Sequence, residues 1–305
     1  MKKNFAHRLA LDLKKNKYKY LIILPVVIWL ILFCYKPMYG IIIAFKRYRP
    51  ARGIAGSDWV GFVYFEQFFK DPYFFRLLKN TFMISFLNLL FAFPAAILFA
   101  LLLNEIKMKW FKKTVQTISY MPHFVSLIVV CGLISSFCNT DGLFNDIIAF
   151  FGGERGNLLL KSELFRPIYV ISGIWQEMGW SSIIFLAALA GIEQEQYEAA
   201  KIDGASRLKQ MWYITLPGLL PTISIMLILN LGSVLSVGYE KIMLLSNALT
   251  YNVADVISYY VYRRGIAGGE YSFSTAVGLF NSAVNLIFLL ASNKISKKMG
   301  QSGLF

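Results

Sequence analysis

Charged side chains are scarce in this sequence. They make up 16% of its 305 residues, whereas hydrophobic residues make up 57%. Because soluble domains carry about a quarter charged residues, this composition excludes an ordinary soluble fold. Apolar runs recur along the chain, and a helix of about 20 such residues crosses a hydrocarbon core of about 30 Å. We therefore predict an integral membrane protein.

Histidine and cysteine are also rare. The two histidines, His7 and His123, lie far apart and form no metal-binding pair. His123 follows Pro122 and is open to two interpretations, a proton relay or a histidine that packs between helices beside a kink. The three cysteines, Cys34, Cys131 and Cys138, lack the spacing of metal ligands or of a disulfide framework. We expect no metal site, and an intramembrane enzyme receives little support.

The sequence contains no Gly-x-x-x-x-Gly-Lys-[Ser/Thr] motif, the loop whose backbone amides hold ATP phosphates. We therefore expect no bound cofactor and no ATPase site in this chain. If the protein works with ATP, another subunit must bind the nucleotide.

Basic residues outnumber acidic ones by 31 to 17, which gives a net charge of +14. This excess could indicate nucleic acid binding. However, the lysines and arginines cluster at the ends of apolar runs, where the positive-inside rule expects them. We interpret the basicity as membrane topology and expect no nucleic acid partner.

The apolar runs predict an all-α membrane protein with six transmembrane helices. Their expected ranges are 20–38, 77–103, 114–137, 167–192, 219–245 and 272–292. The prediction assigns residues 1–19 to a basic cytoplasmic N-terminus, 20–292 to one transmembrane domain and 293–305 to a cytoplasmic tail. An even number of spans then places both termini in the cytoplasm.

Three segments are expected on the outside: residues 39–76, 139–166 and 246–271. The first is rich in aromatics, which could grip a sugar face or lie in the membrane interface. Its basic residues conflict with the positive-inside rule, but the cluster at the N-terminus is stronger. The second contains a short apolar piece, 143–151, that we expect to lie along the outer surface.

A polar stretch separates the fourth and fifth predicted spans. Residues 194–201 favour helix, and Gly204 supplies the left-handed turn that ends it, so a second helix can begin at Ala205 or Ser206. Pro217 predicts a bend where the chain re-enters the membrane. We expect a rigid helix-turn-helix outside the bilayer that suits docking into another protein's groove.

This stretch resembles the EAA loop of permease subunits of binding-protein-dependent ABC importers. The pattern is E-A-A, three residues, G, nine residues and I-x-L-P, and every fixed position is present. The residues predicted to couple the permease to an ATPase are Glu198, Ala199, Ala200, Asp203, Gly204, Ile214, Leu216 and Pro217.

The resemblance extends over nearly the whole chain and is to importers of the oligosaccharide-uptake type, similar to maltose permeases. It implies that residues 20–292 form a permease domain whose coupling loop spans about 193–217. It also implies a bacterial cytoplasmic membrane location and four kinds of partner. These are a second permease subunit, two ATPase subunits, an extracellular or periplasmic solute-binding protein and a carbohydrate substrate.

The fourth predicted span carries Glu177 in mid-membrane, where a carboxylate is costly unless it faces protein, water or a partner. We predict a substrate path formed by Trp175, Gln176, Glu177, Trp180, Asn88, Asn230 and Asn281. Amide and aromatic side chains bind hydroxyls and sugar faces. Each asparagine could instead serve hydrogen bonding between helices.

The function predicted from the sequence is therefore an ATP-driven importer permease for a carbohydrate. The alternative is a secondary transporter of a small polar solute, driven by an ion gradient. That class needs paired intramembrane carboxylates or broken helices in related halves, and Glu177 alone supports it weakly.

Overall fold

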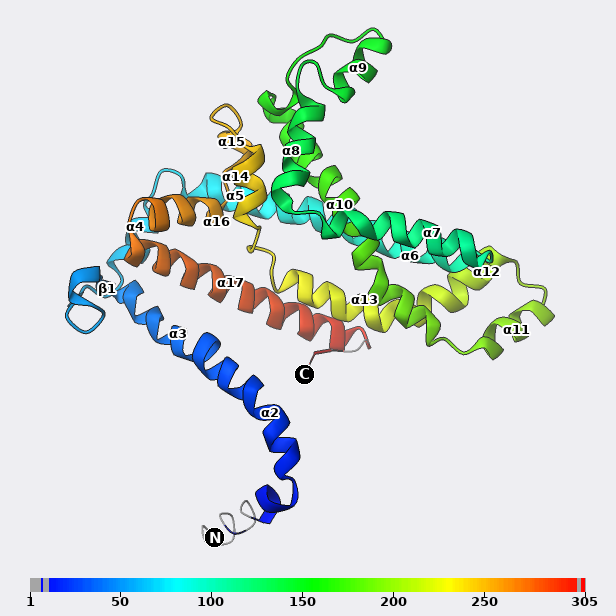
Figure 1. Cartoon of the computed structure of the whole chain (residues 1–305), viewed down its shortest axis with the longest axis horizontal. Coiled ribbons are helices and arrows are strands. Elements are labelled where there is room, and N and C mark those ends of the chain that lie inside the picture. The colour runs from blue at the N-terminus through cyan, green and yellow to red at the C-terminus, as the bar shows by residue number, and fades with distance from the viewer. Residues whose placement is uncertain (1–6, 8–10, 301–302, 305) are drawn as a thin grey trace.

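The computed structural model describes residues 7, 11–300 and 303–304, and nearly all of them lie in helices or their connections (Figure 1). The strands among them are β1 (Lys46–Arg47) and β2 (Asp58–Trp59), a two-residue antiparallel pair. The predicted all-α fold is confirmed apart from this hairpin. Parts of the predicted N-terminal and C-terminal segments, 1–6, 8–10, 301–302 and 305, lie outside the described residues.

The first helical segment stands apart from the bundle along α2 and α3 and joins it at its end, which packs against α17 (Figure 1). It comprises α2 (Lys17–Trp29), a π-helical turn (Leu30–Tyr35), α3 (Lys36–Met38) and a 3₁₀ segment (Tyr39–Phe45). None of its most apolar stretch is buried against the rest of the chain. Because its side chains are apolar on all sides, this segment needs lipid or another protein around it.

The hairpin and the second long helical segment follow. A 3₁₀ turn (Pro50–Arg52), β2 and α4 (Val63–Phe69) lead into α5 (Phe74–Leu87). A π-helical turn (Asn88–Ala92) joins α5 to α6 (Phe93–Glu105), so the helix predicted at 77–103 is continuous. At the other end of the chain, α17 (Tyr271–Lys298) contains the helix predicted at 272–292.

The helix predicted at 114–137 is interrupted, so that prediction is wrong. α7 (Lys109–Tyr120) ends in a 3₁₀ turn (Met121–Phe124), and α8 (Leu127–Cys138) starts afresh after it. Pro122 lies in the turn, and the Ser126 hydroxyl accepts a hydrogen bond from the amide of Val129 to cap α8. The short apolar piece beyond α8 forms α9 (Leu143–Phe150), followed by a 3₁₀ turn (Leu158–Leu160).

The helix predicted at 219–245 is also interrupted. α12 (Arg207–Gln210), a π-helical turn (Met211–Thr215) and α13 (Leu216–Leu231) form one helical run. The chain then leaves helical geometry and resumes it in α14 (Tyr239–Leu245). Three short helical pieces, α15 (Tyr251–Ala254), α16 (Ile257–Val261) and a π-helical turn (Tyr262–Ala267), lead to α17.

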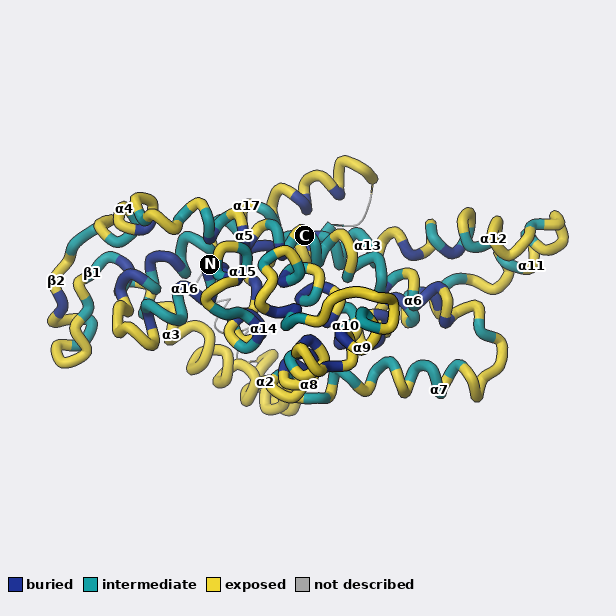
Figure 2. Tube along the Cα trace, turned by 90° about the horizontal axis from the view of Figure 1, so that it is seen from above, coloured by how far each residue is buried: buried dark blue, intermediate teal, exposed yellow. Residues whose placement is uncertain are grey.

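α10 (Ser162–Ala190) is the centre of the bundle and packs against α6, α7 and α13. Figure 2 shows its buried stretches in the middle of the molecule, while α2, α7 and the segment around α11 and α12 are largely exposed. α11 (Gln194–Ile202) lies beyond the end of α10. Gly179 allows the close approach of α7, because a Cβ atom there would lie 2.2 Å from the backbone oxygen of Ser119.

Within the part of the chain that the structure describes, five helical segments are long and apolar enough to cross a membrane: Lys17–Phe45, Phe74–Glu105, Leu127–Phe150, Arg207–Leu231 and Tyr271–Lys298. α10 is as long as these, but Gln176 and Glu177 in its middle make it more polar. The protein is thus an all-helical membrane protein with about five apolar spans.

The contact at Gly179 generates a prediction about stability. Gly179→Ala should lower the free energy of unfolding by about 1–3 kcal/mol, because α7 and α10 must separate to admit the methyl group. The thermal unfolding midpoint of the protein in detergent checks this. Gly132→Ala in α8 is the control, because its Cβ would meet nothing within 4 Å. Equal midpoints for the two variants would contradict the proposed close contact.

Candidate functional site

The polar loop between α10 and α13 folds as the sequence predicts. α11 covers Gln194–Ile202, and Gly204 adopts a left-handed conformation with φ of +73°. Ser206 then caps α12, since its hydroxyl accepts a hydrogen bond from the amide of Lys209. The predicted helix, glycine turn and second helix are confirmed.

Most of the predicted coupling residues on this loop face solvent. Glu198, Ala199, Asp203 and Gly204 are exposed, and Ala200 is half-buried. Two large apolar side chains flank the glycine turn, Ile202 with 86% and Leu208 with 72% of their surface exposed. Helices that dock into a groove present such apolar anchors beside polar residues.

The loop is fixed to the membrane helices at both ends. The Tyr197 hydroxyl and the Thr215 hydroxyl share a hydrogen bond of 3.0 Å, and the Ala200 carbonyl accepts one from the Ala205 amide at 2.8 Å. At the base of the loop, Ile192 packs over Gly218, where a Cβ would lie 2.7 Å from its side chain. A movement of α11 must therefore carry the ends of α10 and α13 with it.

Pro217 lies within a helical run rather than at a break between a loop and a helix. A π-helical turn that includes Ile214 precedes it, and α13 starts at Leu216. The wider π-helical geometry accommodates the proline ring and its missing amide hydrogen. The predicted re-entry point is thus helical on both sides.

A cavity of about 310 Å³ lies where α10, the α5–α6 helix and the end of α13 meet. α10 contributes one face, with residues one helical turn apart: Gly173, Glu177, Ser181 and Phe185. From the second helix come residues of the π-helical turn, a geometry that often occurs at functional sites. The third wall includes Asn230 and the non-helical segment 233–238.

The structure brings three of the seven predicted path residues to this cavity: Glu177, Asn88 and Asn230. Trp175 and Trp180 lie off the cavity face of α10 and are 50% and 43% exposed. Gln176 is buried beside that face. Neither of the two predicted tryptophans therefore lines this cavity.

Asn281 supports the cavity from behind. Its amide donates to the Leu235 carbonyl at 3.2 Å, so it ties α17 to the non-helical segment between α13 and α14. Asn281 does not line this cavity itself. Asn285, one turn further along α17, accepts from the Leu235 amide at 2.9 Å and donates to the Ser236 hydroxyl at 2.8 Å. Sequence reasoning missed Asn285, although its i,i+4 spacing from Asn281 could have indicated it.

Glu177 is held by a partner from the broken α7–α8 segment. His123 Nδ1 lies 2.8 Å from Glu177 Oε2, and the imidazole ring stacks on Trp180 with centroids 4.4 Å apart and planes at 2°. The carboxylate therefore has a defined position at the cavity wall. His123 thus stacks on Trp180 and contacts Glu177 beside Pro122, a geometry that suits both interpretations of this histidine left open by the sequence.

Lys241 is a buried cation that the sequence analysis overlooked because it lies inside the range predicted as an apolar span. It is 8% exposed, and its Nζ donates to the Tyr169 carbonyl at 3.0 Å and lies 4.8 Å from the Tyr169 ring centroid. Among the described residues, it forms no ion pair within 4.0 Å. A Cβ on Gly173 would lie 3.4 Å from Nζ, so the ammonium sits directly behind the cavity wall.

Residues 92–301, which include α10, the polar loop and most of the cavity wall, match the family described as binding-protein-dependent transport system inner membrane component. The chain belongs to that family. The polar loop, most of the cavity wall and the buried Lys241 of this membrane permease component lie within the matched region.

Similar proteins cover nearly the whole permease. It is 49% identical to the polygalacturonan/rhamnogalacturonan transport system permease protein YteP of Bacillus subtilis over 305 residues, covering 100% of this chain and 95% of the relative. It is also 49% identical to protein LplB of the same organism over 294 residues, covering 96% of this chain and 92% of the relative.

Solved structures agree with this relationship. The permease is 43% identical, with a TM-score of 0.88, to a chain of a bacterial ABC transporter involved in the import of the acidic polysaccharide alginate, covering 96% of this chain and 100% of that one. A second structure, of the bacterial alginate ABC transporter in complex with alginate pentasaccharide-bound periplasmic protein, has a TM-score of 0.89 at 42% identity, covering 97% and 100% of the two chains.

The contact between His123 and Glu177 generates a second prediction. In a double-mutant cycle, His123→Phe and Glu177→Leu should couple by about 1 kcal/mol in the free energy of unfolding, because both side chains are partly solvated. Phenylalanine keeps a ring over Trp180. Thermal unfolding of the four proteins in detergent measures the coupling. As a control, the effects of His123→Phe and Glu66→Leu on the free energy of unfolding should add. If the effects of His123→Phe and Glu177→Leu also simply add, the contact is contradicted.

Proposed function

We propose that this permease forms, with a second permease subunit, the translocation path of an ATP-driven importer for acidic oligosaccharides such as pectin fragments. The observation that carries the substrate class is the 49% identity over the full length to a polygalacturonan/rhamnogalacturonan permease. The alginate importer, which is 43% identical, supports it because alginate is also acidic. A periplasmic or extracellular binding protein would deliver the substrate, and two ATPase subunits would drive transport.

The proposed topology has six spans, with α10 as the one that is more polar than the rest. A helix that carries Gln176 and Glu177 is tolerated in a membrane where it faces protein or a water-filled cavity. α10 meets this condition because it packs between α6, α7 and α13 and lines the cavity. In this topology the loop 193–217 and both termini lie in the cytoplasm, and residues 20–292 form the permease domain.

The proposed coupling runs through α11. Glu198, Ala199, Ala200, Asp203 and Gly204 would enter a groove of the ATPase, with Ile202 and Leu208 as apolar anchors. When ATP binding closes the ATPase pair, the two docked loops would move together. The ties from Tyr197 to Thr215 and from Ile192 to Gly218 would pass this movement to α10 and α13. ATP changes the state of the path only if it binds the two states with different affinity.

The electrostatics of the cavity fit an anionic substrate. Glu177 would repel a sugar carboxylate, but His123 holds its carboxylate through a hydrogen bond. Lys241 lies behind Gly173 and forms no ion pair within 4.0 Å in the described part of the chain, so it adds a positive charge to a cavity whose lining includes the Glu177 carboxylate. In a site of low dielectric, such a charge acts across the cavity wall.

Lys241 supplies a test of the substrate class. Lys241→Met should fold, because methionine fills a similar space and the ammonium leaves no carboxylate unpaired. The trigalacturonate concentration that gives half-maximal uptake should rise about tenfold. The reason is that two unit charges about 12 Å apart, here the ammonium and a sugar carboxylate, attract by about 1.4 kcal/mol at an effective dielectric of 20.

The measurement is ATP-dependent uptake into vesicles that contain both permeases, the ATPases and the binding protein. Lys161→Met, which removes an exposed cation outside the bundle, is the control and should leave uptake unchanged. Uptake of neutral maltotriose in preference to trigalacturonate would contradict the proposed substrate class. Uptake by the purified permease alone, driven by an ion gradient, would contradict the proposed ATP-driven mechanism.

The turn at Gly204 tests the coupling role. Gly204→Asp should insert and fold, because a side chain there meets nothing within 4 Å and the left-handed conformation costs about 1–2 kcal/mol. ATP hydrolysis should no longer drive uptake, since the new carboxylate lies on the surface proposed to enter the ATPase.

ATPase activity and uptake, measured in the same vesicles, check this expectation. Gly152→Asp is the matched control, because Gly152 ends α9 with the same pair of backbone hydrogen bonds, a φ of +80° and open space around it. Normal coupling in Gly204→Asp would remove the role assigned to the loop.

A further inference from the structure

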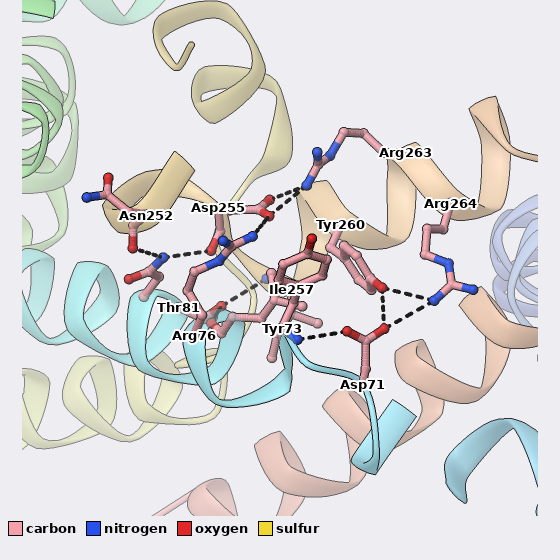
Figure 3. Close-up of polar contacts among 12 residues, drawn as sticks. Asp71, Tyr73, Arg76, Thr81, Asn252, Asp255, Ile257, Tyr260, Arg263 and Arg264 are labelled. Atoms are coloured by element: carbon pink, nitrogen blue, oxygen red, sulfur yellow. Dashed lines mark hydrogen bonds and ion pairs between the residues drawn. The ribbon is translucent and has the colours of Figure 1, made fainter. Parts of the chain in front are cut away.

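A second pocket, called here the arginine pocket, lies at the other end of the bundle from α11. It has a volume of about 570 Å³, and Figure 3 shows many of its side chains. The start of α5 contributes Tyr73 and Arg76, and α16 with the following π-helical turn contributes Tyr260 and Arg263. The remaining wall is formed by residues of the segment 248–255, including Tyr251, Asn252 and Asp255.

The charges in this pocket do not cancel. Arg263 Nη2 lies 2.6 and 2.7 Å from the two carboxylate oxygens of Asp255, and Arg76 Nη2 lies 3.3 Å from one of them. Burial raises the pKa of Asp255, although Arg263 and Arg76 act in the opposite direction. The pocket holds one surplus positive charge when Asp255 is ionised and two when it is protonated.

The neighbouring ion pairs do not remove this surplus. Arg264 pairs with Asp71, to which the Tyr260 hydroxyl also donates (Figure 3), and it pairs with Glu270 as well. Arg166, which donates to the Asn80 side chain at 2.8 Å, adds another cation nearby. The whole network therefore contains four arginines and three carboxylates.

Both pocket arginines retain capacity to bind a ligand. Arg76 and Arg263 are 35% and 33% exposed, whereas Asp255 is 1% exposed. In the described part of the chain, Arg76 makes one hydrogen bond to protein, from Nη2. A guanidinium offers five donors in a planar fork that matches a carboxylate.

Aromatic rings complete the pocket. The Arg76 guanidinium carbon lies 4.4 Å from the ring centroid of Tyr73, and that of Arg263 lies 4.9 Å from Tyr251. Aromatic faces pack against the apolar faces of sugars, while cations beside them bind acidic substituents. This pairing distinguishes an acidic sugar from a simple anion.

The pocket is also held rigidly. The Asn80 side-chain amide donates to the carbonyls of Asn252 and Asp255, each at 3.1 Å. The Thr81 hydroxyl accepts from the Ile257 amide at 3.0 Å. These contacts fix the segment between α15 and α16 onto α5, so little ordering is needed when a ligand binds.

We propose that the arginine pocket binds one uronate residue of an acidic oligosaccharide on the external face of the permease, before the chain enters the cavity. The sugar carboxylate binds Arg76 and Arg263, and the sugar ring lies against Tyr73 and Tyr251. This inference rests on the proposed function, which supplies the external orientation and the acidic substrate.

The test measures binding at the pocket itself, using trigalacturonate as the probe. Ala248 is an exposed residue of the pocket wall, and Ala248→Cys in a Cys34→Ser background provides a thiol for labelling with a neutral maleimide. In the assembled transporter without its binding protein, trigalacturonate should slow labelling and neutral maltotriose should not. A thiol at the exposed Phe150 in α9, introduced as Phe150→Cys, should label at the same rate with and without sugar.

A matched pair of charge substitutions then tests the arginine. Arg76→Gln should raise the half-protecting concentration of trigalacturonate about tenfold, the loss expected for one charged hydrogen bond. Asp255 keeps its two contacts with Arg263 in this variant. Lys79→Gln removes the same charge from the exposed side of α5, outside the pocket, and should change the value less than twofold.

A second pair covers the case in which Arg76→Gln fails to fold. Leu249 lines the pocket and is 64% exposed, so Leu249→Glu adds a negative charge without touching the ion pair, and Leu249→Gln is its neutral control. Leu249→Glu should raise the half-protecting concentration of trigalacturonate, whereas Leu249→Gln should not. If trigalacturonate protects the thiol but is not transported, the pocket stands and the proposed function is contradicted. If it is transported but gives no protection, the proposed pocket is overturned. Equal half-protecting concentrations within each pair of variants would overturn it as well.

Discussion

The break in the helical backbone between Leu231 and Tyr239 is the constraint on which the rest of this permease depends. A helix interrupted at membrane depth frees amide and carbonyl groups that lipid cannot satisfy, each at a cost of several kcal/mol. The side chains of Asn281 and Asn285 on α17 satisfy the groups of Leu235, and the Ser258 hydroxyl donates to the carbonyl of Val237 at 2.5 Å. The break is stable because neighbouring helices bring polar side chains to it, and the space that it opens becomes the cavity.

α10 provides the opposite wall of this cavity and depends on two glycines. Gly179 lets the backbone of α7 approach, which places the α7–α8 turn and its His123 beside Glu177. Gly173 leaves room for the Lys241 ammonium directly behind the wall. Gly173 and Gly179 therefore allow close helix packing and also set where the charged side chains lie.

The sequence predicted the parts of the fold that depend on local patterns. The apolar runs 77–103 and 272–292 are helical because their length and composition allow little else. α11, the Gly204 turn and the start of α12 follow from helix propensity and from one glycine with positive φ. In both cases the signal lies within the segment that it describes.

The break at 121–126 has local signals in Pro122 and Ser126, but the sequence analysis took Pro122 only as a kink within one span. The break at 232–238 escaped prediction because its stability comes from distant residues. Gly232, Ser233 and Ser236 hinted at an interruption, but the partners that make it tolerable lie on α17 about 50 residues later. Lys241 escaped for a similar reason, since an apolar run hides a lysine whose ammonium binds the backbone of Tyr169. For the cavity, sequence reasoning found Glu177, Asn88 and Asn230 as polar residues in apolar runs, but could not tell that Trp175 and Trp180 point elsewhere.

Charge is distributed along the molecule in a way that composition alone does not reveal. At one end, the arginine pocket has more cations than carboxylates; in the middle, Lys241 stands without a partner carboxylate among the described residues, while Glu177 is bound by His123. A polyanion that moved between these places would have a cation near each of them, beside the Glu177 carboxylate at the cavity, and would not be held by a continuous row of cations. Spaced, moderate attraction permits entry and still permits release, which a transport path requires because a site that binds too tightly cannot pass its substrate on.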